Sequence, residues 1–175
     1  PEMRSTGEVL GMADTFGTAF YKAEEAANQK LPVKGAVLLT VADKDKQFIG
    51  SIAKKFHEMG FKIFATKGTG EVLKNCEIPF EIAWKIHEQR PNIADLIKNG
   101  QIQIIVNTPA GKQSQYDDSY IRKNAIKYRI PYMTTIAAAH AAVKGIEAMI
   151  KSGNSYDVKS LQKYHREILE SPIDG

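Results

Sequence analysis

Residues 61–70 read Phe61-Lys62-Ile63-Phe64-Ala65-Thr66-Lys67-Gly68-Thr69-Gly70, and this stretch decides the fold. Its apolar first half predicts a strand over residues 61–65, and a helix is expected from Glu71 to Asn75. A strand that ends in a turn rich in glycine and threonine and then opens a helix favours anion binding, because free N–H groups and the helix dipole attract negative charge. The stretch matches neither G-x-x-x-x-G-K-[ST] nor G-x-G-x-x-G, so it indicates no nucleotide-hydrolysing or dinucleotide motif.

The rest of the chain alternates between expected strands and helices. Residues 35–41 form a continuous apolar run, which is typical of a strand covered on both faces. Further strands are expected at 61–65, 101–106 and 130–133, with a short strand or extended piece at 78–86; helices are expected at 43–59, 71–75, 92–98, 117–128, 134–150 and 158–169. This order predicts an α/β fold: an open, mostly parallel sheet of about five strands with helices on both faces. One helix over residues 14–28, with Asp14 as its N-cap, precedes the sheet.

Three expected loops carry polar donors at the edge of the sheet where ligands bind in such folds, namely 42–46, 66–70 and 107–112. Their convergence predicts a site for a phosphate or carboxylate group. The candidate residues are Thr66, Lys67 and Thr69 in the glycine-rich turn, Asn107 and Thr108 after a strand, and the lysines Lys46 and Lys85. The alternatives are a turn with surface threonines, an Asx-type turn before Pro109, and solvated lysines.

Composition limits the class of protein. A chain of 175 residues with 43% hydrophobic and 25% charged residues fits one soluble globular domain with a short appendage. No apolar run is long enough to span a bilayer. The single cysteine, Cys76, excludes an internal disulfide framework and indicates a reducing cytoplasm. A net charge of +4 with dispersed lysines suits a small anionic ligand better than a nucleic acid, so neither nucleic acid nor membrane is an expected partner.

Motifs for metal binding or nucleophilic catalysis are missing from the sequence. The four histidines have no neighbours at metal-ligand spacing; they are His57, His87, His140 and His165. No G-x-S-x-G motif is present. Asp117 and Asp118 are expected to cap or begin a helix, and Trp84 either stacks on a ligand or packs in the core. The sequence therefore nominates no catalytic residue and no metal ligand.

The chain resembles the carboxy-terminal end of the large subunit of carbamoyl-phosphate synthase. Residues 1–11 resemble the signature that closes the second ATP-grasp unit of that family, and residues 16–27 resemble its terminal helix. From about Gly35 the chain is similar to the allosteric domain, which has a methylglyoxal-synthase-like, Rossmann-like fold. The matching motifs lie at 65–69, 87–91, 97–100, 106–109 and 118–122. The resemblance implies an ATP-grasp tail and linker over residues 1–32 and a regulatory domain over 33–175, cut from a longer polypeptide.

The resemblance further implies that this domain binds an effector and is not catalytic alone. In the bacterial family UMP inhibits, IMP activates and ornithine activates, whereas the urea-cycle form takes N-acetylglutamate. By motif, the implied phosphate-site residues are Thr40, Lys46, Thr66, Lys67, Gly68, Thr69 and Lys85. Asn107 and Thr108 then border the base and ribose, and Ser119 reaches the ligand. Tyr132 and Thr134 match the ornithine side, although Met133 stands between them where the family pattern has an acidic residue.

The parent protein implied by the resemblance is an ATP-dependent ligase of pyrimidine and arginine biosynthesis that uses ATP with Mg or Mn. Its partners are the rest of the large subunit and the glutaminase small subunit, and a homo-oligomer is possible. The rival interpretation is a methylglyoxal-synthase-type lyase acting on a small phosphorylated substrate. That lyase needs two aspartates, but residues 89–92 and 107–109 supply no carboxylate at the matching turns. A purely structural oligomerisation domain is a third interpretation.

Overall fold

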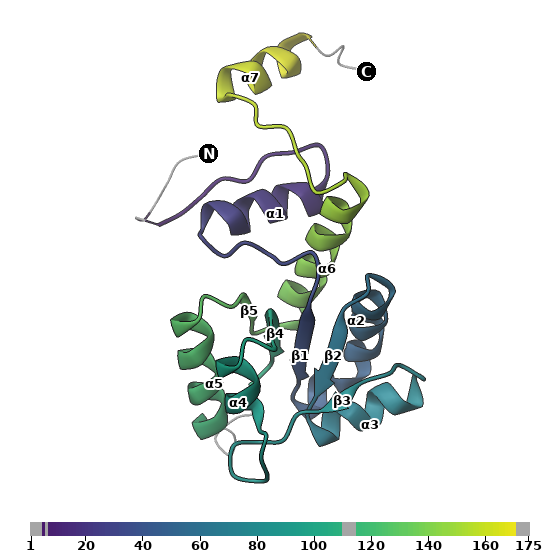
Figure 1. Ribbon diagram of the computed structural model, residues 1–175. Coiled ribbons are helices and arrows are strands. Elements are labelled where there is room, and N and C mark those ends of the chain that lie inside the picture. The colour runs from purple at the N-terminus through teal and green to yellow at the C-terminus, as the bar shows by residue number, and fades with distance from the viewer. Residues whose placement is uncertain (1–4, 6, 110–114, 171–175) are drawn as a thin grey trace.

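The computed structural model describes residues 5, 7–109 and 115–170 and contains one parallel sheet. Its five strands are ordered β3-β2-β1-β4-β5 (Figure 1). The strands are β1 (Ala36–Thr40), β2 (Lys62–Ala65), β3 (Glu81–Ile82), β4 (Ile104–Asn107) and β5 (Tyr132–Met133). The open parallel sheet predicted from the sequence is therefore confirmed.

Helices cover both faces of this sheet, as predicted. They are α1 (Phe16–Ala26), the 3₁₀ helix η1 (Asp43–Asp45), α2 (Lys46–Glu58), α3 (Lys67–Asn75), α4 (Ile93–Lys98), α5 (Gln115–Lys127), α6 (Ile136–Lys151) and α7 (Leu161–Glu170). Buried side chains of α2, α3 and α6 belong to the apolar cluster on one face, and those of α4 and α5 belong to the cluster on the other (Figure 1).

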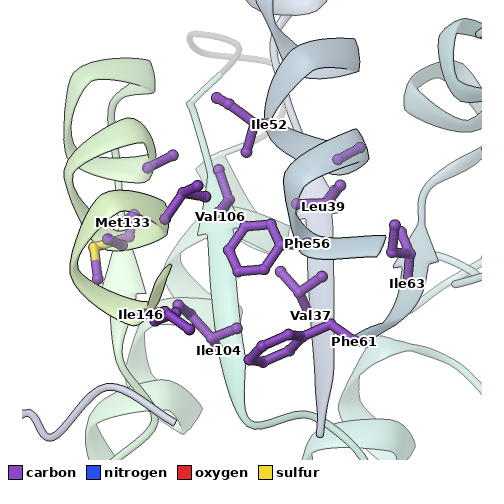
Figure 2. Packing of buried hydrophobic residues seen from close by; sticks show 14 of the residues in the cluster. Val37, Leu39, Ile52, Phe56, Phe61, Ile63, Ile104, Val106, Met133 and Ile146 are labelled. Carbon is purple, nitrogen blue, oxygen red and sulfur yellow. The ribbon is translucent and has the colours of Figure 1, made fainter. Parts of the chain in front are cut away.

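The central strand β1 explains why its sequence is apolar throughout. Successive side chains of a strand point to opposite faces, so a strand between two helical layers has no solvated side. Val37 and Leu39 pack against Phe56 of α2 in the first cluster, whereas Leu38 joins the second. Figure 2 shows Phe56 beside Val37 and among the side chains of neighbouring strands. All four of these side chains are fully buried.

The glycine-rich stretch is part of a helix, not a turn that precedes one. The prediction that the helix begins at Glu71 is wrong, because α3 begins at Lys67. The glycines allow close packing instead: a Cβ atom at Gly70 would lie 2.4 Å from Cε2 of Phe80. A Cβ atom at Gly68 would lie 3.2 Å from the Lys46 Nζ atom. Glycine, which disfavours helix interiors, is retained here because neighbouring side chains occupy the space of a Cβ.

Helix α1 packs directly across α6, where two glycines bring the backbones close together. A Cβ atom at Gly17 would lie 2.5 Å from the carbonyl oxygen of Lys144. The side chain of Thr15 caps α1 by accepting a hydrogen bond from Thr18 N, so the prediction of Asp14 as the N-cap is wrong. The buried Tyr21 hydroxyl donates to the Leu31 carbonyl at 3.0 Å and fixes the segment that leads to β1. The predicted domain boundary at residue 32 stays a prediction.

Candidate anion-binding site

A cavity of about 390 Å³ lies at the carboxyl ends of the central strands. The chain runs from β1 outward to β2 and β3 and then returns to the other side of β1 for β4 and β5, so the strand order reverses between β1 and β4. Ligands of open α/β sheets bind beyond the carboxyl ends of the strands at such a point. Nine nominated residues line the cavity: Thr40, Lys46, Thr66, Lys67, Gly68, Thr69, Lys85, Asn107 and Thr108. The structure therefore brings these residues together, within a single site.

One wall of the cavity is cationic. It is built on the N-terminus of α3, where Thr66 occupies the N-cap position without a side-chain capping bond. The first backbone N–H groups of a helix have no partner within the helix and carry its positive dipole end. Lys46 projects over Gly68, and its ammonium is held 2.8 Å from the Asp43 carboxylate. The hydrogen bond from Lys46 lowers the pKa of the exposed Asp43 carboxyl group.

Three threonine hydroxyls form the floor of the cavity. Thr69 Oγ1 accepts a hydrogen bond from the backbone N–H of Val41 at 3.1 Å, and Thr108 Oγ1 accepts one from Ala42 at 2.9 Å. The Thr66 hydroxyl donates to Thr69 Oγ1 at 3.3 Å. These bonds fasten the segment after β1 to α3 and to the end of β4. These threonines, predicted from the sequence to bind a ligand, thus also have a structural role that the sequence does not reveal.

The opposite wall carries two carboxylates that were not predicted from the sequence to lie in the site. Asp117 and Asp118 both lie in the first turn of α5 and line the cavity; the helix begins at Gln115, two residues before the predicted start, so Asp117 is not its N-cap. Among the side-chain nitrogen and oxygen atoms of the described residues, Asp117 Oδ1 alone is both buried and without a hydrogen-bond partner. The Nδ1 atom of His87 lies 3.7 Å from it. Ser119, which was nominated instead, is exposed on α5 and is not among the described residues that line the cavity.

The segment that presents Lys85 is a compact turn. The Lys85 backbone N–H donates to Glu88 Oε2 at 3.0 Å, and the Asn92 side chain donates to the Ile86 carbonyl at 3.1 Å. Trp84 pairs with Asn92 through a short parallel bridge and is not among the described residues that line the cavity. These bonds hold the exposed Lys85 side chain at the rim, where it can meet an anion.

Tyr132 and Thr134, the expected ornithine-side residues, line a second cavity of about 740 Å³. Asn107 lies between the two cavities: its Nδ2 atom donates to Tyr132 Oη at 2.7 Å and to Asp118 Oδ1 at 3.1 Å. Burial raises the pKa of the Tyr132 hydroxyl, and the hydrogen bond from Asn107 partly offsets that rise. Ornithine binding at Tyr132 and Thr134 stays a prediction.

Within the described part of the chain, two kinds of feature are missing, a cluster of metal-ligating side chains and a helix able to cross a membrane. No group of three or more His, Cys, Asp or Glu side chains there could hold a metal ion. No helix within residues 5, 7–109 and 115–170 is both long and apolar enough to cross a membrane.

The fold and the cavity define an open, parallel α/β domain with a polar cavity at the point where its strand order reverses. Residues 49–134 match the family model of the MGS-like domain, and this part of the chain belongs to that family. Over nearly its whole length the chain is similar to carbamoyl phosphate synthase large chains. It is 48% identical to the large chain of Gemmatimonas aurantiaca over 172 residues, which is 98% of this chain and 15% of that protein.

Two further relatives are named as the carboxy-terminal section of that large chain. The Aquifex aeolicus protein is 42% identical over 168 residues, which is 94% of this chain and 31% of the relative. The Methanopyrus kandleri protein is 47% identical over 154 residues, which is 87% of this chain and 28% of the relative. The chain therefore spans less than a third of these three relatives. The crystal structure of ForH aligns with 70% of this chain at 14% identity and a TM-score of 0.48, a likeness too weak to bear on function.

Proposed function

We propose that this chain is the regulatory domain of a carbamoyl phosphate synthase large chain and that it binds a nucleoside monophosphate such as UMP or IMP. The observation that carries the proposal is the gathering of Lys46, Lys67 and Lys85 around the N-terminus of α3, at the point where the strand order reverses. Lysine ammonium groups and a helix N-terminus together suit a phosphate group. The relatives, all named as large chains or sections of them, supply the parent protein.

The carboxylates favour a nucleotide over a dicarboxylate. Asp117 and Asp118 stand on α5 after β4, whereas Lys67 opens α3 after β2, and β1 lies between these two strands. Neighbouring strands are about 4.8 Å apart, so the ends of β2 and β4, which lead to Lys67 and to the two aspartates, are separated by roughly 10 Å. A ligand with phosphate oxygens at one end and hydroxyl donors at the other fits both walls. N-acetylglutamate would place a second negative charge near these aspartates, which repel it.

Calorimetric titration of the chain with UMP, IMP, uridine, ornithine and N-acetylglutamate tests this proposal. We expect UMP or IMP to bind and uridine, which has no phosphate, to bind far more weakly. Lys85→Ala should weaken nucleotide binding about tenfold or more, because a hydrogen bond to a charged group contributes about 1.5–3 kcal/mol. The matched control is Lys62→Ala, since Lys62 pairs with Glu81 at 2.8 Å and does not line the cavity. Equal affinity for UMP and uridine, or binding of N-acetylglutamate alone, would refute the proposal that the chain binds a nucleoside monophosphate.

A second candidate function is a methylglyoxal-synthase-type lyase. The observation that favours it is Asp117, whose carboxylate has one buried oxygen near His87 in the same cavity as the lysines. A carboxylate so placed is able to accept a proton from a small phosphorylated substrate. Turnover of dihydroxyacetone phosphate that is abolished by Asp117→Asn would establish this activity and displace the regulatory proposal.

The proposal includes several finer predictions. Regulation requires that the effector bind one state of the large chain more tightly than another, since coupling equals that difference in affinity. The remainder of the large chain would use ATP with Mg or Mn and would work with a glutaminase small subunit in the cytoplasm. Ornithine at Tyr132 and Thr134, and a homo-oligomer, belong to the same set of predictions.

A further inference from the structure

The cavity that gathers the three lysines is also lined by acidic side chains. Among the described residues that line it, carboxylates outnumber lysines by five to three, and the acidic residues are Asp43, Glu71, Glu88, Asp117 and Asp118. Carboxylates are ionised at neutral pH, so they offset the positive charge of the lysines. A single phosphate group is attracted to the lysines, but each further phosphate group of a ligand meets carboxylates that repel it. The cavity wall therefore limits the negative charge that a ligand can carry.

Asp43 is the acidic residue that directly contacts the cationic wall. Its Oδ1 atom lies 2.8 Å from the Lys46 Nζ atom. The same ammonium group lies beside the first turn of α3, because a Cβ atom at Gly68 would be only 3.2 Å from it. The Asp43 side chain is 94% exposed and the Lys46 side chain 30%, so the carboxylate is the outer member of the pair. A phosphate group that reaches this ammonium must share it with Asp43.

The backbone holds Asp43 at this place even though an exposed ion pair is weak. Asp43 opens η1 directly after Ala42. Ala42 is buried, its N–H donates to Thr108 Oγ1 at 2.9 Å, and its carbonyl accepts the N–H of Asp45 at 2.9 Å. The negative charge of Asp43 therefore stays near the cationic wall in any rotamer of its side chain. Repulsion of a second phosphate group needs only this charge at this position, and it does not depend on the strength of the ion pair.

We propose that Asp43 is a specificity-determining residue, which restricts the ligand of this cavity to one phosphate group and excludes nucleoside diphosphates and triphosphates. The inference rests on the proposed function, because it takes the lysine-lined cavity to be a phosphate site. A second phosphate group extends either toward the carboxylates of α5 or outward past Lys46, where it meets Asp43. Even in bulk water, a pair of unit charges about 4 Å apart changes a binding constant about fivefold. One fixed carboxylate therefore suffices to separate a monophosphate from a diphosphate.

Calorimetric titration with UMP, UDP and UTP tests the role of Asp43, in a buffer with EDTA because divalent cations would neutralise the phosphates. In the wild type, we expect UDP and UTP to bind about fivefold more weakly than UMP, or weaker still. Asp43→Asn should lower the ratio of the UDP and UMP dissociation constants about fivefold, whereas Asp43→Glu, which keeps the charge, should preserve the ratio. Asp45→Asn is the matched control, because it removes the same charge from η1. Asp45 is not among the described residues that line the cavity, and it forms no ion pair with a described residue.

The role of Asp43 is overturned if Asp43→Asn leaves the ratio unchanged, or if Asp45→Asn lowers it equally; UMP binding in that result would leave the proposed function standing.

Inorganic phosphate and pyrophosphate separate the role of Asp43 from the identity of the nucleotide. Their binding is followed by the amide signal of Gly68 in ¹⁵N NMR spectra, which also verify that each variant is folded. We expect Asp43→Asn to favour pyrophosphate over phosphate about fivefold more than the wild type does. This result without any binding of UMP would refute the nucleotide and leave the role of Asp43 standing. A Gly68 signal that responds to neither anion in either protein would overturn the inference, because the cavity would then hold no phosphate.

Discussion

The α1–α6 crossing predicts that Gly17→Ala destabilises the protein although alanine is the better helix former. The new Cβ atom would lie 2.5 Å from the carbonyl oxygen of Lys144 and 3.0 Å from its carbon. A close carbon–oxygen contact is about 3.3 Å, so the helices must separate by about 0.8 Å. Such overpacking costs about 1–3 kcal/mol, and the helix preference of alanine offsets about 0.5–1 kcal/mol. We expect the free energy of unfolding to fall by about 1–2 kcal/mol, and Tm to fall by about 2–8 °C.

Gly145→Ala on the facing helix is the matched control. Its Cβ atom would lie 3.3 Å from the carbonyl oxygen of Gly17 and 3.4 Å from Leu31 Cδ1, which are tight but tolerable contacts. The helix preference of alanine should leave this variant within about 1 kcal/mol of wild type. Urea unfolding followed by circular dichroism compares the variants, and trypsin cleavage after Lys22 reports detachment of α1. The reasoning is refuted if Gly17→Ala is as stable as wild type while Gly145→Ala is the weaker protein.

Two further predictions concern hydrogen bonds. Asn107→Ala removes the bonds to Tyr132 and Asp118 from a side chain that is 1% exposed, so the free energy of unfolding should fall by about 1–3 kcal/mol. The same change should raise the pKa of Tyr132, because the hydrogen bond from Asn107 lowers it. An absorbance titration, with Tyr132→Phe as the reference, measures this pKa, and an unchanged value would contradict the prediction. The pKa of Glu25 is lowered in the folded protein by hydrogen bonds from Tyr156 and, to a smaller extent, from Lys30. These bonds therefore stabilise the folded state fully above the unfolded pKa of about 4.3, and this stabilisation is lost as pH falls through the folded pKa. In Glu25→Gln, the midpoint of urea denaturation should fall less between neutral and acidic pH than it does in the wild type.

The sheet was predictable because its signal is local. Each buried strand shows its environment in its own residues, as the run from 35 to 41 does, and the turn signals between strands give the order of elements. The start of α3 was not predictable in this way. Its glycines are explained by Phe80 and Lys46, which approach from other elements, and a single sequence does not reveal such contacts.

The site was predictable in part for a related reason. Residues at the ends of parallel strands converge whatever the details of packing, so Thr66 and Asn107 could be placed at one edge. Asp117 was placed correctly in the first turn of α5, but which way that turn faces depends on how α5 packs against α4 and the sheet. Ser119 points elsewhere for the same reason: two residues along a helix are about 200° apart around its axis.

The threonine-braced floor of the cavity has a consequence for the thermodynamics of binding. The backbone after β1 is already fixed by the hydroxyls of Thr69 and Thr108, so a ligand need not order it. The ordering cost of binding then comes mainly from long side chains at the rim, at about 0.5–1.5 kcal/mol for each lysine that is immobilised. Differences in affinity among anions should therefore depend on how many of these lysines each one immobilises, and the floor should look the same in the free and bound states.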